Sequence, residues 1–123
     1  MLELREENEM KTMRELCHFV KAELDHDKYK ECENRICKAM AQFPDAPEPH
    51  NLFGILAEKK GRHASAMRHF RASLDLMPTY KPASQNLRLF GELFCSMRLC
   101  AYDEEDCIPM ESDEAKAHVE RIF

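Results

Sequence analysis

The chain has 123 residues, of which 44% are hydrophobic and 33% are charged, and its formal net charge is −5. This length suits one domain, and this composition suits a soluble helical protein with a hydrophobic core. A net negative charge gives no general reason to expect nucleic-acid binding, and no stretch reaches the roughly 20 apolar residues of a membrane-spanning helix.

Residues 2–44 predict a first helical hairpin. From residue 2 to residue 24, apolar side chains recur at helical spacing with charged residues between them, and the glutamates at the start favour a helix N-terminus. The sequence Asp-His-Asp at residues 25–27 indicates a turn. A second apolar stripe then runs from Tyr29 to Met40 and is followed by Phe43 and Pro44.

Residues 47–80 predict a second hairpin with small residues where its helices meet. Apolar residues spaced by three and four positions lie on both sides of a break before Gly61. Gly61 can adopt the positive φ that ends a helix at low cost, and Pro78 stops the second helix. Gly54 and Ala66 are the positions at which a bulkier side chain would hold the two helices apart.

The second hairpin resembles the tetratricopeptide repeat, a helical hairpin whose length sets the period of the family. The resemblance rests on a small-residue pair, a turn glycine, an alanine followed four residues later by phenylalanine, and a closing proline. These positions are Phe53, Gly54, Ala57, Gly61, Ala66, Phe70 and Pro78. The sequence departs from the family at His50, where tryptophan is preferred, and at Ala57, where tyrosine is preferred.

The first hairpin follows the second at the family's period. Pro44 precedes Pro78 by one repeat length. Other positions align at the same offset: Phe19 with Phe53, Cys32 with Ala66, and Ile36 with Phe70. We therefore expect one repeat over residues 13–46, with a degenerate sequence, and another over residues 47–80.

A third helical run is expected to cap the second repeat. Apolar residues form a wide stripe over residues 81–102, which indicates burial on more than one side. An acidic C-terminal segment follows at residues 103–123. The resemblance implies a single all-α domain over residues 1–123, in which antiparallel helical hairpins stack as a short right-handed superhelix with a long capping helix.

The resemblance also implies a concave groove, because the first helix of each tetratricopeptide hairpin lines an inner surface that commonly binds an extended peptide or a partner helix. The groove residues would be Arg14, His18, Lys21, Asn51, Ile55, Gln85, Asn86 and Leu89. Basic and apolar residues share this surface, which favours an amphipathic or mildly acidic peptide over a clamped C-terminal carboxylate. For any single one of these residues, an ordinary solvated helix face is the alternative.

The leading hypothesis is a non-enzymatic protein-protein interaction module, an adaptor that binds a peptide or partner helix in this groove. The alternative is a structural self-association unit whose groove is occupied by its own acidic tail or by a second copy. Repeat stacks usually need about three units to cover their apolar faces. We therefore expect the capping helix to expose Leu89, Leu93 and Cys100 in part, and two copies to associate as a homodimer.

The basic run from Lys59 to Arg71 has a structural interpretation. Phosphate contacts come from lysine and arginine, but this run lacks exposed aromatic side chains for base stacking. We interpret it as the solvated outer face of the second hairpin and expect no nucleic-acid partner.

The six cysteines are expected to be structural thiols in a reducing cytoplasm. Cys32 and Cys37, five residues apart on a helix, point about 140° apart, so they are poorly placed to hold one ion. A metal or redox sensor is the alternative for these cysteines. No phosphate loop, nucleophile elbow or metalloprotease motif occurs, so we expect no enzyme activity, metal, cofactor or membrane association.

Overall fold

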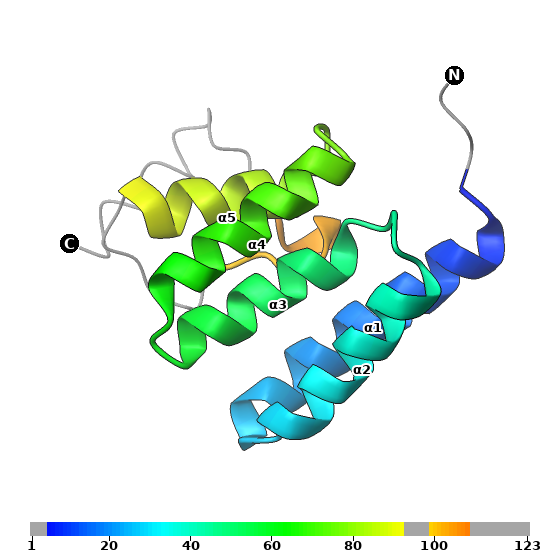
Figure 1. Cartoon of the computed structure of the whole chain (residues 1–123), viewed down its shortest axis with the longest axis horizontal. Coiled ribbons are helices and arrows are strands. Elements are labelled where there is room, and N and C mark those ends of the chain that lie inside the picture. The colour runs from blue at the N-terminus through cyan, green and yellow to red at the C-terminus, as the bar shows by residue number, and fades with distance from the viewer. Residues whose placement is uncertain (1–4, 93–98, 109–123) are drawn as a thin grey trace.

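The computed structural model describes residues 5–92 and 99–108, and over these ranges the fold is all-α (Figure 1). The helices are α1 (Glu7–Glu23), α2 (Tyr29–Gln42), α3 (Glu48–Lys59), α4 (His63–Leu76) and α5 (Lys81–Glu92). Two short 3₁₀ turns, η1 (Leu24–His26) and η3 (Glu104–Asp106), complete the described elements. Helices α1 and α2 form one hairpin, α3 and α4 form the next, and α5 packs against α4.

The first hairpin forms as its pattern predicts. Helix α1 buries the residues of its apolar stripe, among them Met13 and Val20, and α2 buries Cys32 and Ile36. The turn between them ends at Asp27, whose φ of 60° is left-handed. Aspartate tolerates this conformation better than most residues, so the local sequence explains where the chain reverses.

The second hairpin closes because Gly54 has no side chain. A Cβ atom at this position would lie 2.7 Å from Cδ1 of Phe70 on α4. The Phe70 ring is fully buried, and its centroid lies 5.9 Å from that of Phe90 on α5, in a nearly parallel stack. One ring therefore joins three helices, and Gly61, with φ at 77°, makes the turn.

Positions one repeat length apart have matching environments in the two hairpins. Three such pairs are buried at both positions: Val20 with Gly54, Cys32 with Ala66, and Ile36 with Phe70. The hairpins also contact each other through α1, α2 and α3. Of the basic run, Lys59 pairs with Asp25 and Lys60 with Glu33, so two of its charges face the first hairpin.

The start of α3 is fixed by two contacts with distant parts of the chain. The Arg5 guanidinium donates to both carboxylate oxygens of Glu48, at 2.6 and 3.0 Å, which neutralises a buried charge. The buried Ser73 hydroxyl on α4 donates to the Pro47 carbonyl at 2.8 Å. The Pro47 carbonyl also accepts from the Asn51 N–H of the same helix, so the hydroxyl adds a bond to a carbonyl that is already paired. The Glu48 carboxylate lies in the first turn, where a negative charge is favourable.

The prediction of one capping helix over residues 81–102 is wrong at its C-terminal end. Helix α5 is described over Lys81–Glu92, and residues 100–103 belong to no helix. The main-chain N–H of Ala101 donates to the Asn86 side chain, and its carbonyl accepts from Asn51 and Asn86. The N–H and the carbonyl of Ala101 therefore do not form the main-chain hydrogen bonds of an α-helix. Of the acidic C-terminal segment predicted over residues 103–123, residues 109–123 lie outside the described residues.

The predicted self-association surface is also wrong where the structure describes it. Leu89 and Cys100 are buried within the chain, with exposed fractions of 1% and 4%. Leu93, the third residue of that surface, lies outside the described residues. Cys100 and Tyr102 belong to the hydrophobic core, and Leu87 and Phe90 of α5 pack against that core.

Helices α3 and α4 share a pair of half-buried imidazoles. The His50 and His69 rings are stacked with centroids 5.8 Å apart, and His69 also stacks on Phe53 at 4.7 Å. Burial lowers the pKa of both histidines, and for His69 the neighbouring His50 and Arg68 lower it further. Burial disfavours the charged imidazole, so the fold stabilises the neutral form of each ring.

Acidification is expected to destabilise the protein through this pair. The unfolded imidazoles, with an ordinary pKa of 6.5, bind protons at a higher pH than the folded ones. The stability that the pair contributes is therefore present above that pKa and lost as pH falls through the depressed folded pKa. Urea unfolding should show that the free energy of unfolding falls less between about pH 7.5 and about pH 5.5 for His69→Phe than for the wild type. The control is His26→Phe at an exposed position. In this variant the free energy of unfolding should fall by as much as in the wild type.

Candidate peptide-binding groove

The structure places the eight groove residues predicted from the sequence on α1, α3 and α5. Arg14, His18 and Lys21 on α1 are exposed, whereas those on α3 and α5 are buried. The buried ones are Asn51, Ile55, Gln85, Asn86 and Leu89. Residues 99–108 of the same chain, which we call the strap, contact both the exposed and the buried members of this groove.

Two asparagines hold the main chain of the strap. The amide nitrogens of Asn51 and Asn86 both donate to the Ala101 carbonyl, at 2.9 and 2.8 Å. The Ala101 N–H donates to the Asn86 side-chain oxygen at 2.7 Å. Asn86 also donates to the Asn51 side-chain oxygen at 2.9 Å, which fixes the orientation of both amides. Both asparagines are fully buried, so these bonds are shielded from water.

Gln85 joins the two ends of the strap. Its side-chain nitrogen donates to the Leu99 carbonyl at 3.1 Å, and its side-chain oxygen accepts from the Ile108 N–H at 2.8 Å. Every hydrogen bond described here from Gln85, Asn51 or Asn86 to the strap involves the strap's main chain. The groove floor therefore binds backbone groups that any residue except proline can offer.

The strap side chains at the asparagine pair are small or aromatic. Ala101 is fully buried and Cys100 nearly so. Tyr102 is also buried, and its pKa is raised, mainly by burial, with further contributions from the nearby Cys100. The strap thus offers two small residues and then a phenol ring to the groove.

The acidic end of the strap pairs with the basic side of α1. His18 Nε2 lies 2.7 Å from a Glu105 carboxylate oxygen, and the Lys21 ammonium pairs with Asp106. The hydrogen bond to Asp106 is the main cause that raises the pKa of Lys21. His18 and Glu105 are about half exposed, at 52% and 59%, so their pairing contributes little energy and is sensitive to salt.

The strap also stabilises its own turn. The Asp106 carboxylate accepts from the main-chain N–H groups of Tyr102 and Asp103, at 3.1 and 3.2 Å. The Asp103 carboxylate accepts from the Glu104 N–H at 2.8 Å. This reciprocal cap at η3 gives the acidic turn a defined shape, in which Glu105 and Asp106 face α1.

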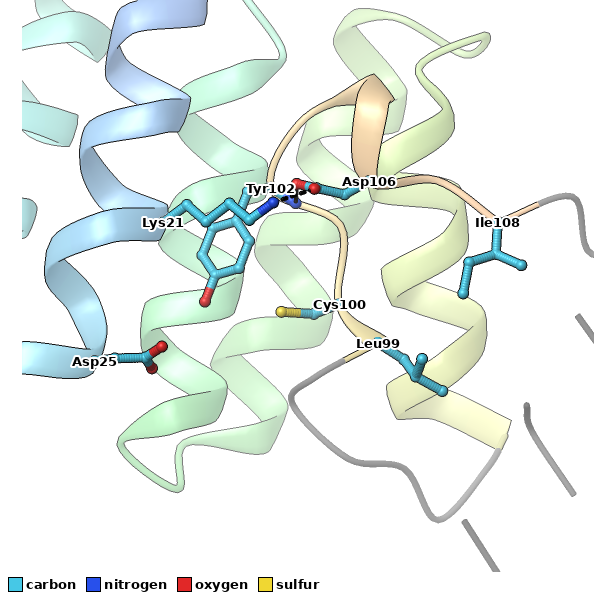
Figure 2. Close-up of a pocket in the computed structure, with 7 residues that line it drawn as sticks. All are labelled: Lys21, Asp25, Leu99, Cys100, Tyr102, Asp106 and Ile108. Atoms are coloured by element: carbon cyan, nitrogen blue, oxygen red, sulfur yellow. Dashed lines mark hydrogen bonds and ion pairs between the residues drawn. The ribbon is translucent and has the colours of Figure 1, made fainter. Parts of the chain in front are cut away.

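A cavity of about 390 Å³ remains beside the strap. Figure 2 shows Lys21 reaching toward Asp106 at this cavity, with the Tyr102 ring beside it. The lining residues are Lys21, Asp25, Leu99, Cys100, Tyr102, Asp106 and Ile108. The cavity combines apolar side chains with paired charges, so the strap leaves part of the surface near α1 unfilled.

The described cysteines are thiols outside disulfide bonds, and most are unsuited to nucleophilic or metal chemistry. Cys17, Cys32 and Cys100 are buried, whereas Cys37 is exposed. Burial raises the pKa of the Cys17 and Cys32 thiols and raises that of Cys107 to about 11. A protonated thiol is a poor nucleophile and a poor metal ligand, so these three have the properties of structural cysteines.

One exposed cluster among the described residues has donors of the kind that bind metals. A ring nitrogen of His18 and carboxylate oxygens of Asp103 and Glu105 lie within 4.8 Å of one another. The ion pair of His18 with Glu105 and the cap made by Asp103 account for this proximity. The cluster therefore belongs to the contact between the strap and α1.

Sequence reasoning missed the strap's side-chain positions and part of its charge pairing. The alternative hypothesis placed the acidic tail in the groove without naming the partners of its acids. In the structure, Glu105 and Asp106 contact His18 and Lys21 on the first helix. The sequence feature that could have indicated the strap is the run of four acidic residues at positions 103–106, directly after an apolar stripe.

No helix in the described part of the chain is long and apolar enough to cross a bilayer. Comparison with protein-family models, curated proteins and solved structures gave no match to this chain.

Proposed function

We propose that this chain is a non-enzymatic protein-interaction module that binds a peptide segment in the groove formed by α1, α3 and α5. The observation that carries the proposal is the Asn51–Asn86 pair, which holds the main chain of Ala101 through three hydrogen bonds. Side chains that bind backbone groups can hold segments of different sequence. The groove already accommodates an irregular segment in this way.

The resemblance to tetratricopeptide repeats supports the same proposal. We propose that residues 13–46 and 47–80 are two such repeats, which is consistent with the matching burial of positions one repeat length apart. Repeats of this kind present their first helices as a binding surface. A cytoplasmic location is part of the proposal, since the described cysteines are free thiols.

A second candidate function is favoured by the strap itself. A chain whose acidic segment occupies its own groove is a structural unit that closes on itself, or that pairs with a second copy by exchanging that segment. Light scattering across a range of protein concentrations tests the exchange. A concentration-dependent dimer would support the exchange, and a monomer throughout would contradict the exchange.

Selection of peptides from a random displayed library, with the full-length chain as bait, tests the leading proposal. We expect peptides whose affinity falls by about tenfold or more when Arg14→Glu and Lys21→Glu are combined, because two favourable charges become repulsive. Both residues are exposed, so the melting temperature should change little.

Charge reversal away from the groove provides the control. Lys30 and Lys38 are exposed on α2, and changing both to glutamate alters the net charge by the same amount. These changes should leave peptide affinity within about twofold of wild type, because exposed charges far from the site are screened. If no peptide is enriched, or if both double variants weaken binding equally, the groove is not a peptide site.

A further inference from the structure

We infer that the groove's partner is an acidic peptide with the strap's own pattern, and that the strap competes with it. The pattern is a small residue, then an aromatic one, then acidic residues at the third and fourth positions after the aromatic. In the strap these are Ala101, Tyr102, Glu105 and Asp106. The inference rests on the proposed function and names the partner class and the regulation of the same groove.

The small position is defined by the asparagine pair. Ala101 is fully buried, and its N–H and carbonyl are both fixed by Asn51 and Asn86. A larger side chain here would have to displace the groove floor or break these bonds, because a close-packed interior leaves no room for added methylenes. The partner residue at this position is therefore alanine, glycine or serine.

The aromatic position follows from the burial of Tyr102. Its ring belongs to the same buried cluster as Ile55 of α3, and its ring borders the cavity near Lys21. An aromatic side chain buries a large apolar area while its polar end remains able to find a partner. A small side chain at this position would leave that space empty.

The acidic positions follow from the basic side of α1. Glu105 pairs with His18, and Asp106 pairs with Lys21. Arg14 is exposed on the same helix, so this side of the groove carries an additional positive charge. Charge complementarity of this kind selects acidic partners and excludes basic ones.

The aspartate after the aromatic residue completes the pattern. The Asp103 carboxylate accepts from the Glu104 N–H, and the Asp106 carboxylate accepts from the main-chain N–H groups of Tyr102 and Asp103. A peptide with aspartate at both positions forms the same turn by itself. It then presents its acids to α1 at a lower ordering cost.

Competition follows because the strap is part of the same chain. A tethered segment acts at an effective concentration on the order of millimolar, so a free peptide of equal intrinsic affinity binds the intact chain weakly. Its apparent affinity equals the intrinsic affinity multiplied by the fraction of chains whose groove is open. Weakening the strap must therefore strengthen peptide binding, whereas weakening the groove must reduce it.

The experiment uses a fluorescent peptide of residues 99–108 with serine at both cysteine positions, titrated into full-length protein. The first variant is Ala101→Pro in the chain, which removes the N–H that Asn86 binds but leaves the groove residues unchanged. We expect it to bind the peptide about tenfold or more tightly than the wild type. The second variant, which we call the surface variant, combines Glu105→Gln with Asp106→Asn. It removes the exposed ion pair with His18 and the partly buried ion pair with Lys21, and it should also raise peptide affinity.

Matched controls separate the strap from a general charge effect. Glu104 is an exposed strap residue whose carboxylate makes no hydrogen bond or ion pair with the described residues. Glu104→Gln should leave peptide affinity unchanged, whereas the combined Glu105→Gln and Asp106→Asn variant should raise it. Lys21→Glu loosens the strap but also damages the groove, so it should not raise affinity. Peptides with Ala101→Leu, or with both Glu105→Gln and Asp106→Asn, should bind the opened chain about tenfold more weakly.

The outcomes distinguish this inference from the proposed function. If neither strap variant binds the acidic peptide better than the wild type, or if the opened chains pair with each other instead, the inference is wrong. Unfolding of Ala101→Pro, together with unchanged affinity in the surface variant, would also overturn it. If library peptides of another chemistry bind the groove while the acidic peptide does not, the inference is wrong and the proposed function is retained. If no peptide binds, the inference and the proposed function are both wrong.

Discussion

Replacing Gly54 with alanine is expected to destabilise the protein by about 1–3 kcal/mol, although alanine normally favours a helix over glycine by about 1 kcal/mol. The steric term should dominate, because the new Cβ would lie 2.7 Å from Cδ1 of Phe70. The Phe70 ring cannot move away easily, since it is fully buried and stacked on Phe90. Urea unfolding followed by circular dichroism measures this change.

Gly91 provides the matched control. It lies in α5, and the contact that a Cβ there would make with the described residues is to the Met67 sulfur, at an ordinary distance of 3.6 Å. Gly91→Ala is therefore expected to be neutral or to stabilise the protein by up to about 1 kcal/mol, through helix propensity alone. Equal effects of the two substitutions would contradict the close approach of α3 and α4 at Gly54.

Replacing Asn86 with alanine is expected to cost about 3 kcal/mol, because buried polar groups that lose their partners cost about 1–3 kcal/mol each. The change leaves the Ala101 N–H without its acceptor. It also removes one of the two donors to the Ala101 carbonyl and the donor to Asn51. These groups form a single buried network, so their losses reinforce one another.

Two measurements test this second expectation. Denaturant unfolding should show the lower stability, and hydrogen exchange should be faster at the main-chain amide of Ala101. The exposed Asn34 on α2 is the control, and Asn34→Ala should change stability by less than about 0.5 kcal/mol. Unchanged exchange at Ala101 in the Asn86 variant would show that the strap does not depend on the asparagine pair.

Much of the fold could be predicted from local sequence. The spacing of apolar residues predicted the first four helices, and the turn glycine and the Asp-His-Asp segment marked where each hairpin reverses. The small residue at Gly54 predicted close contact between two helices, and the contact with Phe70 confirms it. These features depend on residues within one or two helical turns or within one hairpin, so local patterns determine them.

The candidate site was predicted only in part. The eight groove residues lie on the three expected helices, but five of them are buried. Two of the five, Asn51 and Asn86, bind Ala101, which lies in a segment that the pattern assigned to the capping helix. The expected exposure of Leu89 and Cys100 was also wrong, since both are buried within the chain.

The sequence by itself determined the all-α class, the two hairpins and the residues that let them close. Only the tertiary structure decided that residues 100–103 are not helical and that the strap contacts the residues predicted to line the groove. The physical reason is the range of the interactions. Helical periodicity is a local property, and residues 99–102 fit it. The bonds from Asn51 and Asn86 to Ala101 span 50 and 15 residues, and they satisfy its main chain in place of a helical ladder.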